Sequence, residues 1–152
     1  ADGLDVHQIR GTYYSLLDCN DTAYLAARAI QFFAPGIPQV YYVGLLAGKN
    51  DAKAVEKSGE GREINRHNYT KEEIEHEVNR GVVQKLAQLI RFRNTHLAFN
   101  GVFAVEPGTH NELNLSWKNA DAWVKLSVSL ETLSAVITCK QPDEAEIQTI
   151  IL

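Results

Sequence analysis

The sequence has no methionine and only two cysteines among its 152 residues. Cys19 and Cys139 lie far apart and fit no metal-ligand spacing, so we interpret them as the reduced thiols of a cytoplasmic protein. Long apolar runs are also missing. The longest, at residues 30–35 and 40–47, are too short or too interrupted to cross a bilayer, and no basic segment followed by an apolar stretch opens the sequence.

Several catalytic signatures are absent as well. There is no Gly-rich phosphate loop and no serine-nucleophile motif, which leaves nucleotide hydrolysis and acyl transfer without support. His76, His96 and His110 have no second ligand at metal spacing, so neither a metal nor another cofactor is expected. A net charge of -4 and a pI of about 5.7 give no reason to expect nucleic acid or an anionic membrane as a partner, whereas a small neutral or anionic metabolite is compatible.

What is present is typical of a globular protein with one modest core. Hydrophobic residues make up 45% of the sequence and charged residues 22%, which argues against disorder. The sequence opens with Ala-Asp-Gly-Leu-Asp instead of an initiator methionine. We therefore expect the chain to be one part of a longer protein.

The first half has the pattern of an α/β unit. Asn20-Asp21 offers an N-cap for a largely buried helix over residues 22–34, which Pro35-Gly36 would end. The β-branched and aromatic run at residues 40–43 has no alternation, which favours a strand of a parallel sheet that is covered on both faces. Helix, tight turn and buried strand in this order indicate α/β architecture.

A long polar segment, residues 49–69, follows the carboxyl end of that predicted strand, where parallel α/β folds carry their active sites. A connection of this length is usually functional or mobile. Thr70 and Glu73 then form a capping-box pattern, and helical apolar spacing continues to about Phe92, with a break expected at Gly81.

The second half predicts a small antiparallel β domain. Strand-like runs cover residues 102–105, 113–117, 122–130 and 135–138, with turn signals between them. We therefore divide the chain into residues 1–99 and residues 100–152. Trp117 and Trp123 would face each other across a hairpin, where they could stack on a sugar, but paired aromatic residues on strands are more often core, and we interpret them as packing.

Two polar clusters could carry function. The first, at residues 5–8, combines Asp5, His7 and Gln8, whose groups suit hydrogen bonds to sugar hydroxyls or to a phosphate. The second is Gly59-Glu60-Gly61-Arg62-Glu63-Ile64-Asn65-Arg66-His67. There Arg62 offers a planar fork of donors for a carboxylate, a diol or a phosphate. From the residues alone, a solvated loop with incidental polar groups explains the first cluster, and a charged surface loop with internal ion pairs explains the second about equally well.

Three blocks in order resemble one family. Residues 23–44, Ala-Tyr-Leu-Ala-Ala-Arg-Ala-Ile-Gln-Phe-Phe-Ala-Pro-Gly-Ile-Pro-Gln-Val-Tyr-Tyr-Val-Gly, resemble the seventh helix and eighth strand of sucrose phosphorylases, in the α-amylase clan. Gly-Arg-Glu-Ile-Asn-Arg-His at 61–67 and Ile-Arg-Phe-Arg-Asn-Thr-His at 90–96 resemble later parts of the same family. Together the blocks cover roughly residues 4–100, and a match in several ordered blocks is specific.

The resemblance implies the C-terminal part of a (β/α)8 TIM barrel, closed by its eighth strand and followed by an antiparallel β domain. It also implies a glycosyltransferase of sucrose metabolism that forms α-glucose 1-phosphate and fructose from sucrose and phosphate. The reaction would be a double displacement with retention, in which an Asp is the nucleophile and a Glu the acid/base. In this family the catalytic carboxylates precede the loop at which this chain begins, so the resemblance implies no catalytic residue in this chain, and the isolated chain should be inactive.

The resemblance also suggests roles for residues. Arg62 matches the arginine that holds the glucosyl unit, while Asp5 and Gln8 match polar residues of the acceptor loop that contact fructose. His7 replaces a usual tyrosine beside the phosphate site. With the neighbouring Arg10, it resembles the branch that acts on sucrose 6'-phosphate, because a partly protonated imidazole would favour a second anionic group.

Alternatives to a sucrose phosphorylase remain at this stage. The parent could be a sucrose 6'-phosphate phosphorylase or a hydrolase of the same clan, and the chain could instead be a non-catalytic carbohydrate-binding or structural module. Against the module, a buried helix and strand without neighbours would leave an open sheet edge. The sequence does not fix the oligomeric state, and a homodimer is one candidate.

Overall fold

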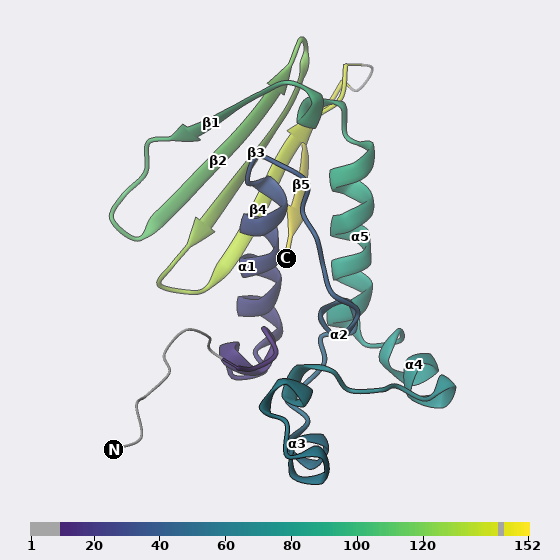
Figure 1. Ribbon diagram of the computed structural model, residues 1–152. Coiled ribbons are helices and arrows are strands. Elements are labelled where there is room, and N and C mark those ends of the chain that lie inside the picture. Colours follow the sequence, from purple (N-terminus) through teal and green to yellow (C-terminus); the bar gives the residue numbers. More distant parts are fainter. Residues whose placement is uncertain (1–9, 143–144) are drawn as a thin grey trace.

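The computed structural model describes residues 10–142 and 145–152 and contains a five-stranded antiparallel sheet with helices on one side (Figure 1). The strands are β1 (Val102–Glu106), β2 (Glu112–Asn119), β3 (Ala122–Ser129), β4 (Ser134–Lys140) and β5 (Gln148–Ile151). The helices are α1 (Asp21–Phe33), α2 (Tyr42–Leu45), α3 (Ala52–Ser58), α4 (Lys71–Glu77) and α5 (Gly81–Thr95), with 3-10 turns η1 (Ser15–Leu17), η2 (Gly61–Asn65) and η3 (Leu97–Asn100). None of the helices within these residues is long and apolar enough to span a membrane.

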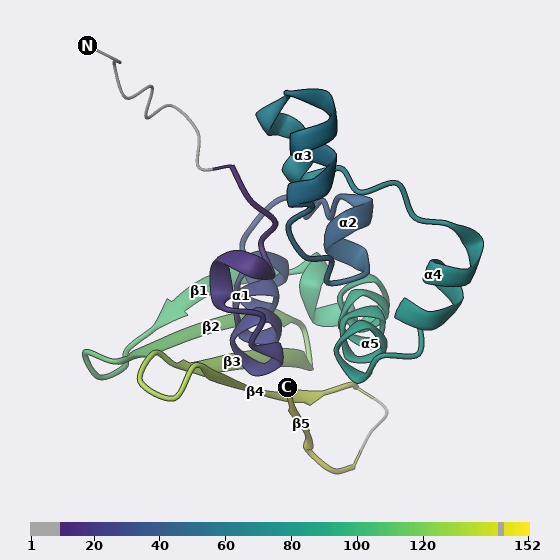
Figure 2. The ribbon, with the colours of Figure 1, turned by 90° about the horizontal axis from the view of Figure 1, so that it is seen from below.

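Helix α1 forms where the sequence predicts it. The side chain of Asn20 caps its start by accepting a hydrogen bond from the Ala23 N–H at 3.0 Å. The helix ends at Phe33, because Pro35 disfavours the helical conformation for the residue before it. Most of the side chains in between are buried, as expected for the central helix of the layer that covers the sheet (Figure 2).

The sheet is a meander in the order β1-β2-β3-β4-β5. Its inner face has apolar rows across neighbouring strands, such as Leu115, Leu126 and Ile137, and all three are buried. The predicted antiparallel domain is thus confirmed, although β5 was missed. The prediction that the two tryptophans face each other is wrong: Trp117 pairs with Val124 in the register, so Trp123 lies on the opposite face.

The sheet and the helices are joined at the end of α1. The last carbonyl groups of a helix have no partner within the helix, and burial makes an unpaired carbonyl costly. Here the Trp117 Nε1–H donates to the Phe33 carbonyl at 2.7 Å, and the Arg93 Nε–H donates to the Phe32 carbonyl at 2.7 Å. The Arg93 guanidinium also lies 4.3 Å from the centre of the Phe99 ring. Trp117 is therefore a packing residue, as predicted.

The strand predicted at residues 40–43 does not form. The backbone is extended through Tyr41, and α2 then begins at Tyr42. Only Val43 of this run is buried, while Tyr41 is 57% exposed, because no strand within the described residues lies beside it to complete a ladder. The polar segment 49–69, expected as a long connection, contains α3 and η2.

Trp117→Phe should lower the free energy of unfolding by about 1–3 kcal/mol, because it leaves the buried Phe33 carbonyl without its donor. Trp123→Phe on the opposite face of the sheet is the matched control and should change stability by less than about 0.5 kcal/mol. Urea denaturation of the three proteins would measure this. Equal losses in both variants would contradict the role given to the Trp117 indole.

Candidate functional site

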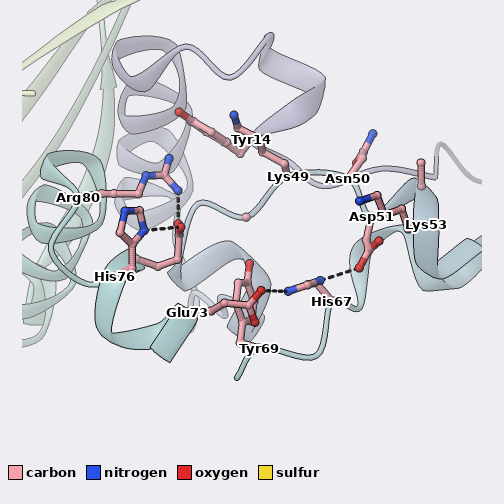
Figure 3. A pocket seen from close by; sticks show the side chains of 13 residues that line it. Tyr14, Lys49, Asn50, Asp51, Lys53, His67, Tyr69, Glu73, His76 and Arg80 are labelled. Carbon is pink, nitrogen blue, oxygen red and sulfur yellow. Dashed lines mark hydrogen bonds and ion pairs between the residues drawn. The ribbon is translucent and has the colours of Figure 1, made fainter. Parts of the chain in front are cut away.

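A cavity of about 660 Å³ is lined by residues of α3 and α4 and of the segments beside them (Figure 3). Charged side chains of both signs surround it, together with two tyrosines. The lining residues with ionisable side chains are Tyr14, Lys49, Asp51, Lys53, His67, Tyr69, Glu73, His76, Glu77 and Arg80. Most of these lining residues therefore belong to the polar segment 49–69 and to α4, and Tyr14 and Arg80 complete the set.

The imidazole of His67 is placed between two carboxylates (Figure 3). Its Nδ1 lies 2.6 Å from Asp51 Oδ2, and its Nε2 lies 3.3 Å from Glu73 Oε1. The hydrogen bond with Asp51, opposed by partial burial and helped by Glu73, raises the pKa of His67 above its usual 6.5. Protonated His67 can donate to both carboxylates at once, whereas the neutral ring can donate to only one.

Both carboxylates also cap helices. Asp51 Oδ1 accepts from the Ala54 N–H at 2.9 Å at the start of α3, and Glu73 Oε2 accepts from the Thr70 N–H at 2.7 Å in the predicted capping box of α4. The contact with His67 lowers the pKa of Asp51, and the Thr70 N–H lowers the pKa of Glu73. His67 thus links the first turns of two helices.

The other wall of the cavity is an ion pair that is tied to α2. Arg80 pairs with Glu77 and donates to the carbonyls of Leu46 and Ala47, both at 3.3 Å. Burial opposes ionisation of Glu77, but hydrogen bonds from Arg80 and His76 outweigh it and lower the pKa of Glu77. Arg80 therefore has a structural role in this wall.

Arg62 lies on η2 with 63% of its side chain exposed. Its Nε is 3.7 Å from a carboxylate oxygen of Glu60 and 3.7 Å from one of Glu63. These are the internal ion pairs expected of a charged surface loop, but exposed pairs of this length contribute little. The guanidinium therefore stays available to a carboxylate, a diol or a phosphate.

Arg62 has a second cation close by in the fold. A Cβ atom added to Gly61 would lie 2.2 Å from Nη1 of Arg10, so the Arg10 side chain passes directly over the backbone of the Arg62 segment. Asp5, His7 and Gln8 lie outside the described residues. The structure thus brings the residue that follows the predicted acceptor loop next to the segment that carries Arg62.

The carboxyl groups of this cluster are not prepared as proton donors. The pKa values of Asp51, Glu73 and Glu77 all shift downward, because each carboxylate accepts hydrogen bonds. A catalytic acid that works near neutral pH would need a raised pKa. These three carboxyl groups therefore do not have the raised pKa of such an acid.

Sequence reasoning missed the central member of the cluster. His67 was noted only as the last residue of the Arg62 motif, and Asp51 was not singled out. The available signal was the capping box at Thr70 and Glu73, together with an aspartate at the start of a short helix. Neither signal indicates that one imidazole joins the two caps.

The raised pKa of His67 predicts a pH-dependent stability. Because the folded pKa exceeds the unfolded one, the contribution is complete below about pH 6.5 and is lost as the pH rises through the folded pKa. Urea denaturation between pH 5.5 and 9 should show that the stability difference between the wild type and His67→Asn shrinks toward alkaline pH. A difference that does not change over this range would contradict the prediction.

Comparison with known proteins gives a consistent result. The chain matches no protein-family model. It is 56% identical over 150 residues, 99% of this chain, to a sucrose 6(F)-phosphate phosphorylase of Thermoanaerobacterium thermosaccharolyticum and covers 31% of that protein. It is 52% identical to a sucrose phosphorylase of Agrobacterium vitis over 91% of this chain and 28% of that protein. The similarity thus extends beyond residues 4–100 into the antiparallel sheet.

A solved structure agrees with these matches. The crystal structure of sucrose 6F-phosphate phosphorylase from Thermoanaerobacter thermosaccharolyticum has a TM-score of 0.93 and 55% sequence identity to this chain, over 96% of this chain and 30% of that one. The chain spans about 30% of the length of the relatives it matches. It is thus a homologue of the sucrose phosphorylases and corresponds to the C-terminal part of these enzymes.

Proposed function

We propose that this chain belongs to a phosphorylase that transfers a glucosyl group from sucrose, or from a phosphate ester of sucrose, to inorganic phosphate. The observation that carries the proposal is 56% identity over 99% of the chain to a protein named for this reaction. The exposed position of Arg62 supports it, because a weakly paired guanidinium suits a hydroxyl-rich or anionic ligand.

In this proposal the chain contributes binding groups and does not break bonds. Arg62 would hold the glucosyl unit, while Asp5, His7 and Gln8 would contact the acceptor. The nucleophile and the acid/base would belong to the part of the relatives that this chain does not cover. Residues 1–99 would complete the catalytic barrel, and residues 100–152 would form the β domain that follows it. A homodimer and a cytoplasmic location stay predictions.

Arg10 favours the phosphorylated substrate. Its guanidinium lies against Gly61, in the segment that carries Arg62, and a cation at this place favours an anionic acceptor. The expected acceptor product is therefore fructose 6-phosphate, with α-glucose 1-phosphate as the other product.

The proposal is tested on the full-length enzyme by measuring release of glucose 1-phosphate. Sucrose 6'-phosphate should give a higher kcat/KM than sucrose, and product formation should require inorganic phosphate. Hydrolysis without phosphate would indicate a hydrolase, and a strong preference for plain sucrose would contradict the choice of substrate.

Arg62→Lys should lower kcat/KM by roughly 10- to 100-fold, because an ammonium keeps the charge but loses the planar fork of donors. Arg66→Lys is the matched control: Arg66 is exposed, lies just after η2 and should tolerate the change with less than about a twofold effect. Similar losses in both variants would speak against a specific contact from Arg62.

A further inference from the structure

The segment that carries Arg62 is held from one side by Asp51. The Asp51 N–H donates to the Ile64 carbonyl inside η2 at 2.8 Å, while Asp51 Oδ2 contacts the His67 ring at 2.6 Å. A single residue thus fixes both the backbone of η2 and the imidazole that follows it. Because Asp51 also caps α3, its own position is set by that helix.

His67 is held from the other sides as well. Its carbonyl accepts from the Tyr42 hydroxyl at 2.9 Å, its ring meets the Tyr69 ring edge-on at 4.5 Å between centroids, and Glu73 contacts Nε2. These neighbours come from α2, from the connection before α4 and from α4. His67 therefore attaches the end of η2 to three surrounding parts of the fold, to α2 through its carbonyl and to the other two through its ring.

Among the residues that the structure describes, Arg62 has weaker contacts than His67. Its ion pairs there are the two long, exposed contacts within its own turn, and such contacts do not set where the turn lies. The backbone of η2 is closed by short 3-10 hydrogen bonds, such as Arg66 N–H to the Glu63 carbonyl at 3.1 Å. The position of the guanidinium is therefore decided by what holds the ends of the turn.

We propose that His67 is a positioning residue that fixes η2, and thereby Arg62, for sugar binding, through its simultaneous contacts with Asp51 and Glu73. The proposal rests on the proposed function of Arg62 and adds a residue to it. His67 does not touch the substrate in this role. It reduces the freedom of the turn that presents the binding group, which lowers the cost of ordering that group on binding.

The charges around the His67 ring determine at which pH it contacts both carboxylates. Asp51 and Glu73 contact it directly, and Tyr69 packs against it. Lys49 and Lys53 line the same cavity and oppose its protonation, but more weakly than the two carboxylates in direct contact with it favour protonation. When the imidazolium of His67 loses a proton, only one ring nitrogen still carries an N–H. The longer of the two contacts, between Nε2 and Glu73, is the one expected to open.

A double-mutant cycle on the full-length enzyme tests the proposal. His67→Ala removes both contacts and should lower kcat/KM for the sugar donor roughly tenfold, mainly through a higher KM. His67→Asn keeps a donor near Asp51 and should recover part of this loss. In an Arg62→Ala background, His67→Ala should change kcat/KM by less than about twofold, because the group it positions is gone.

His76→Ala is the control. His76 lines the same cavity with 79% of its side chain exposed and contacts Glu77, but no residue of η2. It should change kcat/KM by less than about twofold. An equal loss for His76→Ala and His67→Ala, or a full tenfold effect of His67→Ala without Arg62, would overturn the positioning role.

A pH profile keeps the test decisive if His67→Ala does not fold. Asp51→Asn still offers an oxygen to cap α3 but removes the charge beside His67, so the alkaline rise of KM should begin at lower pH than in the wild type. An unshifted profile would overturn the proposal. If the wild-type enzyme releases no glucose 1-phosphate at all, the proposed function fails; if it does and the variants behave like the wild type, only the positioning role fails.

Discussion

The fold depends on how the carbonyl end of α1 is satisfied. The carbonyls of Phe32 and Phe33 cannot be paired inside the helix, and both are buried between the sheet and α5. Trp117 from β2 and Arg93 from α5 supply the two missing donors. Because these side chains come from different layers, the same two hydrogen bonds fix the sheet and α5 relative to α1.

The first half of α1 also contacts the segment that holds the candidate site. The Tyr24 hydroxyl donates to the Gly44 carbonyl at 2.5 Å, and the buried Arg28 lies so close to Gly44 that a side chain there would collide with its guanidinium. This places α2, whose Tyr42 holds the His67 carbonyl. His67 is thus connected to the buried helix α1 by polar contacts, which are geometrically stricter than apolar packing.

Local patterns predicted much of this fold because local physics decides it. The Asn20 cap, the Thr70–Glu73 capping box and the strands β2 to β4 all appear where the sequence predicts them. The prediction of a strand at residues 40–43 was wrong, because a strand needs hydrogen-bonding neighbours that a local sequence pattern does not specify. The short strand β5 was not predicted for a related reason: its residues are mostly exposed, so its sequence shows no alternation of apolar and polar residues.

The site was less predictable than the fold, since its geometry comes from pairs distant in sequence. Arg62 could be named from its motif, but the contact of His67 with Asp51 spans sixteen residues, with α3 and η2 between them. A binding arginine must stay weakly paired, or a ligand would have to break its ion pairs first. The position of its guanidinium must then be set by the backbone that carries it. For this reason, the strong and partly buried charge contacts lie at His67, and the weak, exposed ones lie at Arg62.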